Sequence, residues 1–185
     1  MNQKRLSSSE FQLYLRDLHL NDALTSIKWR NDNIIWSMLT GQRRSVSLKD
    51  EKEWIKRTLK DKTQFVQAVC LKENDKYIGN VYLKKIDSMN HAAEFSKLIG
   101  EKSEWGKGYG TEMTRLMLYE GFNSLGLNRI YAYQLTSNIA SVQVNMKCGF
   151  SKEGVLRQAI WKDGKFRDIF IMSILREEYE QYGGL

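Results

Sequence analysis

Three glycines within five residues, Gly106, Gly108 and Gly110, stand between a strand-like segment and a helix-like segment. Residues 92–99 alternate polar and apolar side chains as a half-buried strand does, whereas residues 111–126 lack this alternation and contain good helix formers. Glycines allow the backbone to pass close to a ligand, and a helix that begins directly afterwards adds unpaired N–H groups. The pattern therefore indicates either a site for phosphate or pyrophosphate, or a tight strand-to-helix turn that binds nothing.

Further segments with strand-like patterns surround this unit. Two of them are joined by a short polar turn, and the last two flank Asp163–Gly164, a dipeptide typical of hairpin turns. The predicted strands are residues 11–15, 65–71, 77–86, 92–99, 129–135, 155–161 and 166–175. Their order with the helices predicts an α/β (mixed α+β) fold, with one sheet in a single domain over residues 1–185.

Helix signals fall between these strands. Asn21 and Asp22 offer caps for a helix that runs to Trp29, with Leu24 and Ile27 on its apolar face.

Two further helices have end signals of their own. Ser47 and Asp50 have the spacing of a capping box, with Asp in place of the usual Glu. Behind it, Leu48, Ile55 and Leu59 share one helical stripe; a later short helix is expected to end at Gly149, because glycine suits the left-handed position past a helix.

Composition limits the possible functions. The 185 residues carry 29 Lys and Arg against 22 Asp and Glu, a net charge of +7, which suits nucleic acid, an acidic membrane surface or a small phosphorylated ligand. No apolar run is long enough to cross a membrane, and the first residues lack the apolar stretch of a secretory signal. Two cysteines and two histidines are too few for a disulfide framework or a zinc site. We expect a cytoplasmic protein without metal.

Two common phosphate loops do not fit the glycine spacing. A Walker loop needs Gly-x4-Gly-Lys-Ser/Thr, and neither Gly106 nor Gly108 provides it. A dinucleotide fingerprint needs Gly-x-Gly-x-x-Gly, whereas the run here is Gly-x-Gly-x-Gly. Nucleotide hydrolysis and hydride transfer are therefore disfavoured.

The run from Trp105 to Gly110 resembles the acetyl-CoA pyrophosphate loop of the GNAT N-acetyltransferase family. That loop is usually Gln/Arg-x-x-Gly-x-Gly/Ala, and Trp105 stands where Gln or Arg is usual, which leaves the backbone amides in place. Residues 138–141 (Asn-Ile-Ala-Ser) and 147–150 (Lys-Cys-Gly-Phe) are similar to a second family segment. WRND at residues 29–32 and EKEW at residues 51–54 resemble the subgroup of ribosomal-protein N-terminal and spermidine acetyltransferases.

The resemblance implies a mostly antiparallel sheet with helices on both faces. Residues 92–99 and 129–134 would splay apart, and the pantetheine arm of acetyl-CoA would lie between them. Lys102, Lys107 or Lys147 would meet the outer phosphates, although each has an alternative interpretation as a solvated surface charge. The implied cofactor-binding residues are Leu98, Ile99, Gly100, Trp105, Gly106, Lys107, Gly108, Tyr109, Gly110, Thr111, Asn138, Ser141, Asn145 and Lys147.

The implied chemistry is direct attack of an amine on the thioester. The amine must be neutral, and Glu94 is the candidate base, or else an outward-facing strand carboxylate. The N–H of Ile99 is the candidate donor to the thioester oxygen. Many family members carry a Tyr that protonates the leaving sulfur, but Asn145 stands there and an amide delivers no proton.

The identity of the acid therefore stays open. Tyr131, Tyr133 and Cys148 are nearby alternatives, and catalysis by positioning alone is feasible because a thiolate leaves without a strong acid. Cys148 as a nucleophile is disfavoured because helix C-termini do not stabilise thiolates.

The acceptor is less well defined. Residues 41–62 contain eight Lys or Arg and four Asp or Glu, which favours an anionic acceptor such as a nucleotide-linked amino sugar or an acidic peptide N-terminus, with a polyamine still open. A basic solvated helix face is the alternative. Four aromatic residues either line the acceptor pocket or belong to the core: Trp36, Trp54, Tyr82 and Trp161.

Rival functions are a catalytically weak acyl-CoA sensor and a basic nucleic-acid-binding module. We favour the enzyme, with acetyl-CoA and an amine as its partners and neither nucleic acid nor membrane. A homodimer is left open.

Overall fold

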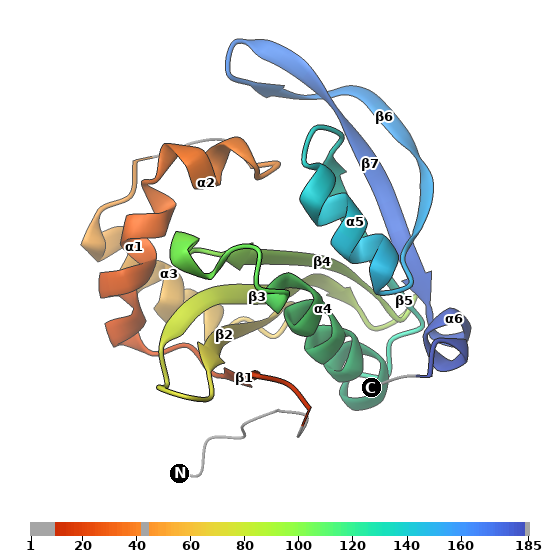
Figure 1. The fold of residues 1–185 in the computed structure, drawn as a ribbon, viewed down its shortest axis with the longest axis horizontal. Coiled ribbons are helices and arrows are strands. Elements are labelled where there is room, and N and C mark those ends of the chain that lie inside the picture. Colours follow the sequence, from red (N-terminus) through yellow and green to blue (C-terminus); the bar gives the residue numbers. More distant parts are fainter. Residues whose placement is uncertain (1–9, 42–44, 184–185) are drawn as a thin grey trace.

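A single seven-stranded sheet runs through the computed structural model, which describes residues 10–41 and 45–183 (Figure 1). The strand order is β1-β2-β3-β4-β5-β7-β6, and every pair is antiparallel except β4 with β5. The strands are β1 (Leu13–Arg16), β2 (Phe65–Leu71), β3 (Tyr77–Asp87), β4 (Ala92–Ile99), β5 (Arg129–Leu135), β6 (Ser151–Lys162) and β7 (Lys165–Leu175). The predicted mixed α/β class, the strand segments and both hairpins are confirmed.

Helices cover both faces of this sheet. They are α1 (Ala23–Arg30), α2 (Asn33–Ser37), α3 (Leu48–Thr58), α4 (Tyr109–Tyr119), α5 (Ile139–Lys147) and α6 (Arg176–Gln181). Neighbouring residues of β2 point to opposite faces, so Val69 packs in the cluster with α4, whereas Ala68 and Cys70 pack in the cluster with α1 and α3. The sheet is therefore buried on both sides along its first strands.

The apolar face of α1 differs from the prediction. Leu24 is 56% exposed, and the helix instead buries Ala23, Ser26 and Trp29. The Asp22 carboxylate does not cap the helix, because it forms a bidentate pair with Arg16 at 2.8 Å.

Other local expectations had mixed outcomes. The capping box of Ser47 and Asp50 is present and begins α3, but Leu59 at the far end is exposed. Gly149 follows α5 in the left-handed conformation, as predicted. The short helices α2 and α6 were not predicted, and α4 continues into a π-helical turn at Glu120–Ser124.

The central feature is the separation of β4 from β5. The two strands pair in parallel at only three positions, from Ala92 with Arg129 to Glu94 with Tyr131. Beyond Glu94, β4 continues to Ile99 and β5 continues to Leu135 without pairing to each other. The predicted splay is confirmed, and it leaves one edge of β4 without a strand partner in the described sheet.

Candidate active site

A cavity of about 500 Å³ lies at the splayed end of β4. Its walls come from β4, the glycine loop, α5, and the residues in and just after α2. The lining residues are Ile35, Met38, Leu39, Lys97, Leu98, Ile99, Trp105, Gly106, Gly108, Tyr109, Gly110, Thr111, Asn138, Ala140, Ser141, Gln143, Val144 and Lys147. The structure therefore brings most of the predicted cofactor-binding residues together, but Gly100, Lys107 and Asn145 do not line this space.

The glycine loop offers backbone amides at the start of α4. Gly106 and Gly108 have φ of +77° and +87°, a conformation that favours glycine. A Cβ at either position would meet nothing within 4 Å, so the space beside the loop is open. Gly108 is the N-cap and provides no side chain, so first-turn N–H groups are available to a ligand. Thr111 corrects the prediction, because its N–H already donates to the Gly108 carbonyl at 2.9 Å.

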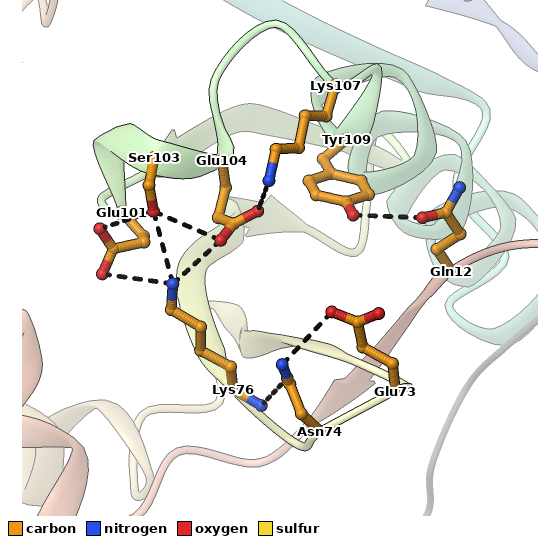
Figure 2. Close-up of polar contacts among 9 residues, drawn as sticks. All are labelled: Gln12, Glu73, Asn74, Lys76, Glu101, Ser103, Glu104, Lys107 and Tyr109. Carbon is orange, nitrogen blue, oxygen red and sulfur yellow. Dashed lines mark hydrogen bonds and ion pairs between the residues drawn. The ribbon is translucent and has the colours of Figure 1, made fainter.

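Figure 2 shows how ion pairs hold this loop. The Glu104 carboxylate accepts from Lys107 at 2.7 Å and from Lys76, the residue before β3, at 2.9 Å. The two ammonium groups lower the pKa of Glu104 to about 2, so the carboxylate stays ionised. Lys107, predicted to bind phosphate, instead turns to Glu104. Its ammonium group shares the Glu104 carboxylate with Lys76, the residue before β3.

The end of β4 has its own backbone contacts. The Gly100 N–H donates to Ile78 O at 2.8 Å, so this amide is occupied, contrary to the prediction that it binds pantetheine. In an antiparallel ladder the direction of the backbone groups alternates, so Leu98 faces β3 and Ile99 faces the splay. The Ile99 carbonyl accepts from Trp105 Nε1 at 2.9 Å. Leu98 thus contributes its side chain to the cavity, and the Ile99 N–H remains the candidate donor.

Asn138 has a structural role at the start of α5. Its Oδ1 accepts from the Ser141 N–H at 3.2 Å, and its Nδ2 donates to the Met38 carbonyl at 3.0 Å. It therefore caps α5 and ties this helix to the segment after α2, in addition to lining the cavity.

The three candidate phosphate lysines differ in their contacts. Lys102 pairs with Asp32 at 2.6 Å, and Lys107 pairs with Glu104. Lys147 lines the cavity from α5, and no salt bridge to another described residue holds it elsewhere. Lys147 is thus the best placed of the three.

Glu94 is not part of the cavity. It sits at the last paired position of β4, where Lys84 and Lys85 bind its carboxylate at 2.9 and 2.8 Å. Burial raises its pKa, but hydrogen bonds from Lys85 and Lys84 outweigh this, and the net pKa is below the usual value. An ionised carboxylate is suitable for a base, but Glu94 does not line the cavity, and its role as the base stays a prediction.

Asn145 is wholly buried behind the cavity wall and contacts a residue that the sequence analysis did not single out. Its Oδ1 accepts from Lys97 Nζ at 2.5 Å, and its Nδ2 has no hydrogen-bond partner among the described residues. Burial lowers the pKa of Lys97 to about 8. The sequence did contain a signal for Lys97, because this lysine interrupts the apolar residues Ala93, Phe95 and Ile99 on one face of the strand.

Several remaining candidates are placed away from the cavity. Burial raises the pKa of the Cys148 thiol, which opposes a nucleophilic role. Tyr131 and Tyr133 form an edge-to-face pair on β5 and do not line the space. Trp54 and Tyr82 pack against the core with α1 and α3, which agrees with the interpretation that they are core residues. Trp161 is exposed on β6.

The described residues form neither a metal site nor a membrane-spanning helix. No three His, Cys, Asp or Glu side chains in this part of the chain gather closely enough to hold a metal ion. None of its helices combines the length and the apolar character needed to cross a membrane.

Comparison with known proteins identifies the family. The model of the acetyltransferase (GNAT) domain matches residues 12–151, and the chain belongs to this family. Fold and family together make it an N-acetyltransferase by class.

Individual relatives are also named as N-acetyltransferases. The uncharacterized N-acetyltransferase p20 of Bacillus licheniformis is 35% identical over 112 residues, which are 60% of this chain and 62% of that protein. The probable N-acetyltransferase YjcK of Bacillus subtilis (strain 168) is 29% identical over 181 residues, 91% of this chain and 97% of that protein. The structure of spermidine N-acetyltransferase from Vibrio cholerae, in complex with CoA and spermine, has a TM-score of 0.85 at 27% identity and covers 91% and 98% of the two chains.

Proposed function

We propose that the protein transfers the acetyl group of acetyl-CoA directly to a primary amine while both substrates are bound. The observation that carries this proposal is the free edge of β4 beyond Glu94, which leads to the amides at Gly106–Gly110 and the start of α4. An extended amide-containing arm suits an unpaired strand edge, and a pyrophosphate suits the N-terminus of a helix. Lys147 would add a positive charge beside it. We also propose that residues 1–185 act as one domain.

Polyamines are the first candidate acceptors. The likeness to the Vibrio cholerae spermidine N-acetyltransferase supports this choice, because it extends over 91% of this chain and the relative was solved with spermine.

An anionic acceptor is the second candidate, and the pairing of the carboxylates favours it. Glu51 binds Ser26 and Arg30, Asp32 binds Lys102, and Glu94 binds two lysines, so these acids are already neutralised by the protein's own groups. Two of the eight basic residues in the predicted acceptor segment, residues 41–62, are Arg43 and Arg44, which lie outside the described residues. An acidic peptide N-terminus or a nucleotide-linked amino sugar would suit such a surface.

The test is acetyl-CoA turnover, measured as thiol release, against polyamines, acidic peptide N-termini and nucleotide-linked amino sugars. Release with spermidine or spermine supports the first candidate, and release with the anionic amines alone supports the second. Binding of acetyl-CoA without release for any amine would instead indicate the sensor.

A pair of glycine variants tests the proposed binding site for acetyl-CoA. Gly108→Val places a β-branched residue at φ +87° beside the cavity, and we expect binding of acetyl-CoA to be lost. Gly164→Val places the same strain at φ +75° in the β6–β7 turn, with nothing within 4 Å, and we expect binding to be kept. Equal binding by both variants would contradict the proposed site.

The quaternary structure and the location of the protein stay predictions. Trp161 and Phe166 form an exposed edge-to-face pair on the β6–β7 hairpin, an apolar surface that would suit a homodimer. Light scattering of the purified protein measures the assembly directly. A cytoplasmic location is still expected.

A further inference from the structure

Lys97 is a charged residue on an otherwise apolar strand face. Ala93, Phe95 and Ile99 share its side of β4 and pack in or against the core with α4, whereas the Lys97 side chain enters the cavity wall. Its Nζ lies 5.1 Å from the centre of the Phe95 ring, a distance at which the ring attracts a cation. The fold therefore keeps an ammonium group among apolar side chains at the splay.

Asn145 orients this ammonium group. The amide is 0% exposed, and its oxygen is bonded to Lys97 Nζ at 2.5 Å while its nitrogen is unpartnered among the described residues. A buried amide nitrogen without a partner is costly, which indicates that the amide is held in place for the bond that its oxygen makes. The lysine and the asparagine are 48 positions apart, so only the fold brings them together.

The other charged or titratable groups around Lys97 come from two helices. Cys148 follows α5 and faces the lysine, Lys147 lines the same cavity, and Arg115 of α4 acts on Cys148. Burial of the ammonium group disfavours the protonated lysine, and the Cys148 thiolate would favour it. Lys97 is thus a cation that can give up its proton.

We propose that Lys97 is the general acid of the acetyl transfer, and this rests on the function proposed above. The amine nitrogen forms a bond to the thioester carbon, the carbon–sulfur bond breaks, and sulfur takes the electron pair. Lys97 Nζ gives its proton to that sulfur, so CoA leaves as the thiol. The surplus proton of the amine passes to solvent, directly or through the candidate base Glu94, and Lys97 is protonated again from solvent.

The proton affinities of the two groups agree with this step. Burial brings the pKa of Lys97 to about 8. A free thiol has a pKa of about 8.5, so transfer between the two is nearly balanced in free energy. Asn145, which stands where many family members carry the acid, would position the lysine instead of donating a proton.

Kinetics of three variants test the proposal. Lys97→Met removes the proton, Lys97→Arg keeps a cation that does not release one, and Lys72→Met is the matched control on the exposed turn after β2. We expect kcat to fall by about 10²-fold or more in both Lys97 variants, with the KM for acetyl-CoA changed little and the control unchanged. The wild-type kcat should decline above about pH 8, because the acid form is lost, and this decline should be absent in both variants.

Three results would overturn the role of Lys97. They are a kcat within twofold of wild type in Lys97→Met, a decline above about pH 8 that persists in that variant, and a rate that rises through this pH range only when Lys97 is present. The last result would make the lysine a base.

A second measurement does not depend on any acceptor. The thiol of bound CoA is titrated by the ultraviolet absorbance of its thiolate, in the wild type and in Lys97→Met. A neighbouring ammonium group should lower the pKa of this thiol, and the shift should disappear in the variant. Equal thiol pKa values would contradict the contact between Lys97 and sulfur. A wild type that shows the shift but acetylates no amine would contradict the proposed function alone.

Discussion

At the scale of single residues, the site shows the limit of what a linear pattern predicts. The absence of the usual tyrosine could be predicted from the sequence, because the nearby Gly149 and Phe150 define the position that Asn145 occupies. The hydrogen bond between Asn145 and Lys97 could not be predicted, because the two residues lie on different elements and meet only across the splay. The same holds for Lys107. Its partner Glu104 is three residues away in the sequence, but the second cation on that carboxylate, Lys76, comes from the turn before β3.

Glu94 allows a residue-scale prediction. If it takes the proton from the amine, Glu94→Gln should lower kcat by about 10²-fold or more. The pKa of Glu94 is below the usual carboxyl value despite its burial, because Lys85 and Lys84 bind the ionised form. The base is therefore active above that lowered pKa, and the acid limb of the wild-type rate should lie below the pH at which a free carboxyl titrates. The rate is measured against pH with a saturating amine.

Glu153→Gln is the matched control for this variant. Glu153 is also a strand carboxylate bound by a cation, Arg129, at 2.6 Å, and it lies away from the cavity. We expect its kcat to be unchanged. If Glu94→Gln lowers only stability and leaves kcat like the control, the carboxylate is an ion-pair partner of the two lysines and not the base.

At the scale of elements, the contact between α1 and the end of β4 positions the cavity. Trp29 of α1 lies against the backbone of Gly100, and a Cβ built at Gly100 would be 1.9 Å from Trp29 Cδ2. The same indole packs on Tyr77 of β3, with ring centres 4.7 Å apart. Trp29, the first residue of the WRND segment, does not line the cavity. It packs on the end of β4, from which Ile99 faces the splay.

Gly100→Ala tests this packing. The added methyl group must displace either the indole or the strand end, and we expect a loss of about 1–3 kcal/mol in the free energy of unfolding. Because the strand end moves, the Kd for acetyl-CoA should also rise. Urea denaturation and a binding titration measure the two effects.

Gly154→Ala provides the comparison on β6. Its nearest neighbour would be Ile171 Cγ2 at 3.9 Å, an ordinary contact, so the change should stay within about 0.5 kcal/mol. A Gly100→Ala protein as stable as this control would contradict the close packing of Trp29.

The elements themselves were largely predictable, for physical reasons. Strand-like runs, alternating in several segments, and the hairpin dipeptide Asp163–Gly164 indicated every strand, although β2 is buried along nearly its whole length and β6 is largely exposed. The apolar face of α1 was wrong, because Leu24 stays exposed and a tertiary contact buries Trp29 instead. The short helices α2 and α6 have five and six residues, too few to show a periodic pattern.

At the scale of the whole molecule, the splay divides the sheet into two parts. β1–β4 and β5–β7 share only three paired positions, and α4, which packs on β1, β3 and β4, also contacts α5 beside the opening (Figure 1). A ligand that contacts both β4 and α5 would therefore join the two parts. Because the chain also carries a net charge of +7, an anionic cofactor should gain from long-range attraction.

Acetyl-CoA should accordingly stabilise the entire fold. A ligand that binds only the folded protein adds about 2.7 kcal/mol at 100 times its Kd, so the melting temperature should rise with acetyl-CoA concentration. The rise should shrink as salt increases, because salt screens the attraction between the basic protein and the phosphates. S-acetyl-pantetheine, which lacks the pyrophosphate and the phosphorylated adenosine, should give a smaller rise that depends little on salt, and Gly108→Val should lose the salt-dependent part of the rise with acetyl-CoA. Equal, salt-independent shifts for both ligands would contradict the role given to the loop at Gly106–Gly110 and to Lys147, since the phosphate groups proposed to bind there are present only in acetyl-CoA.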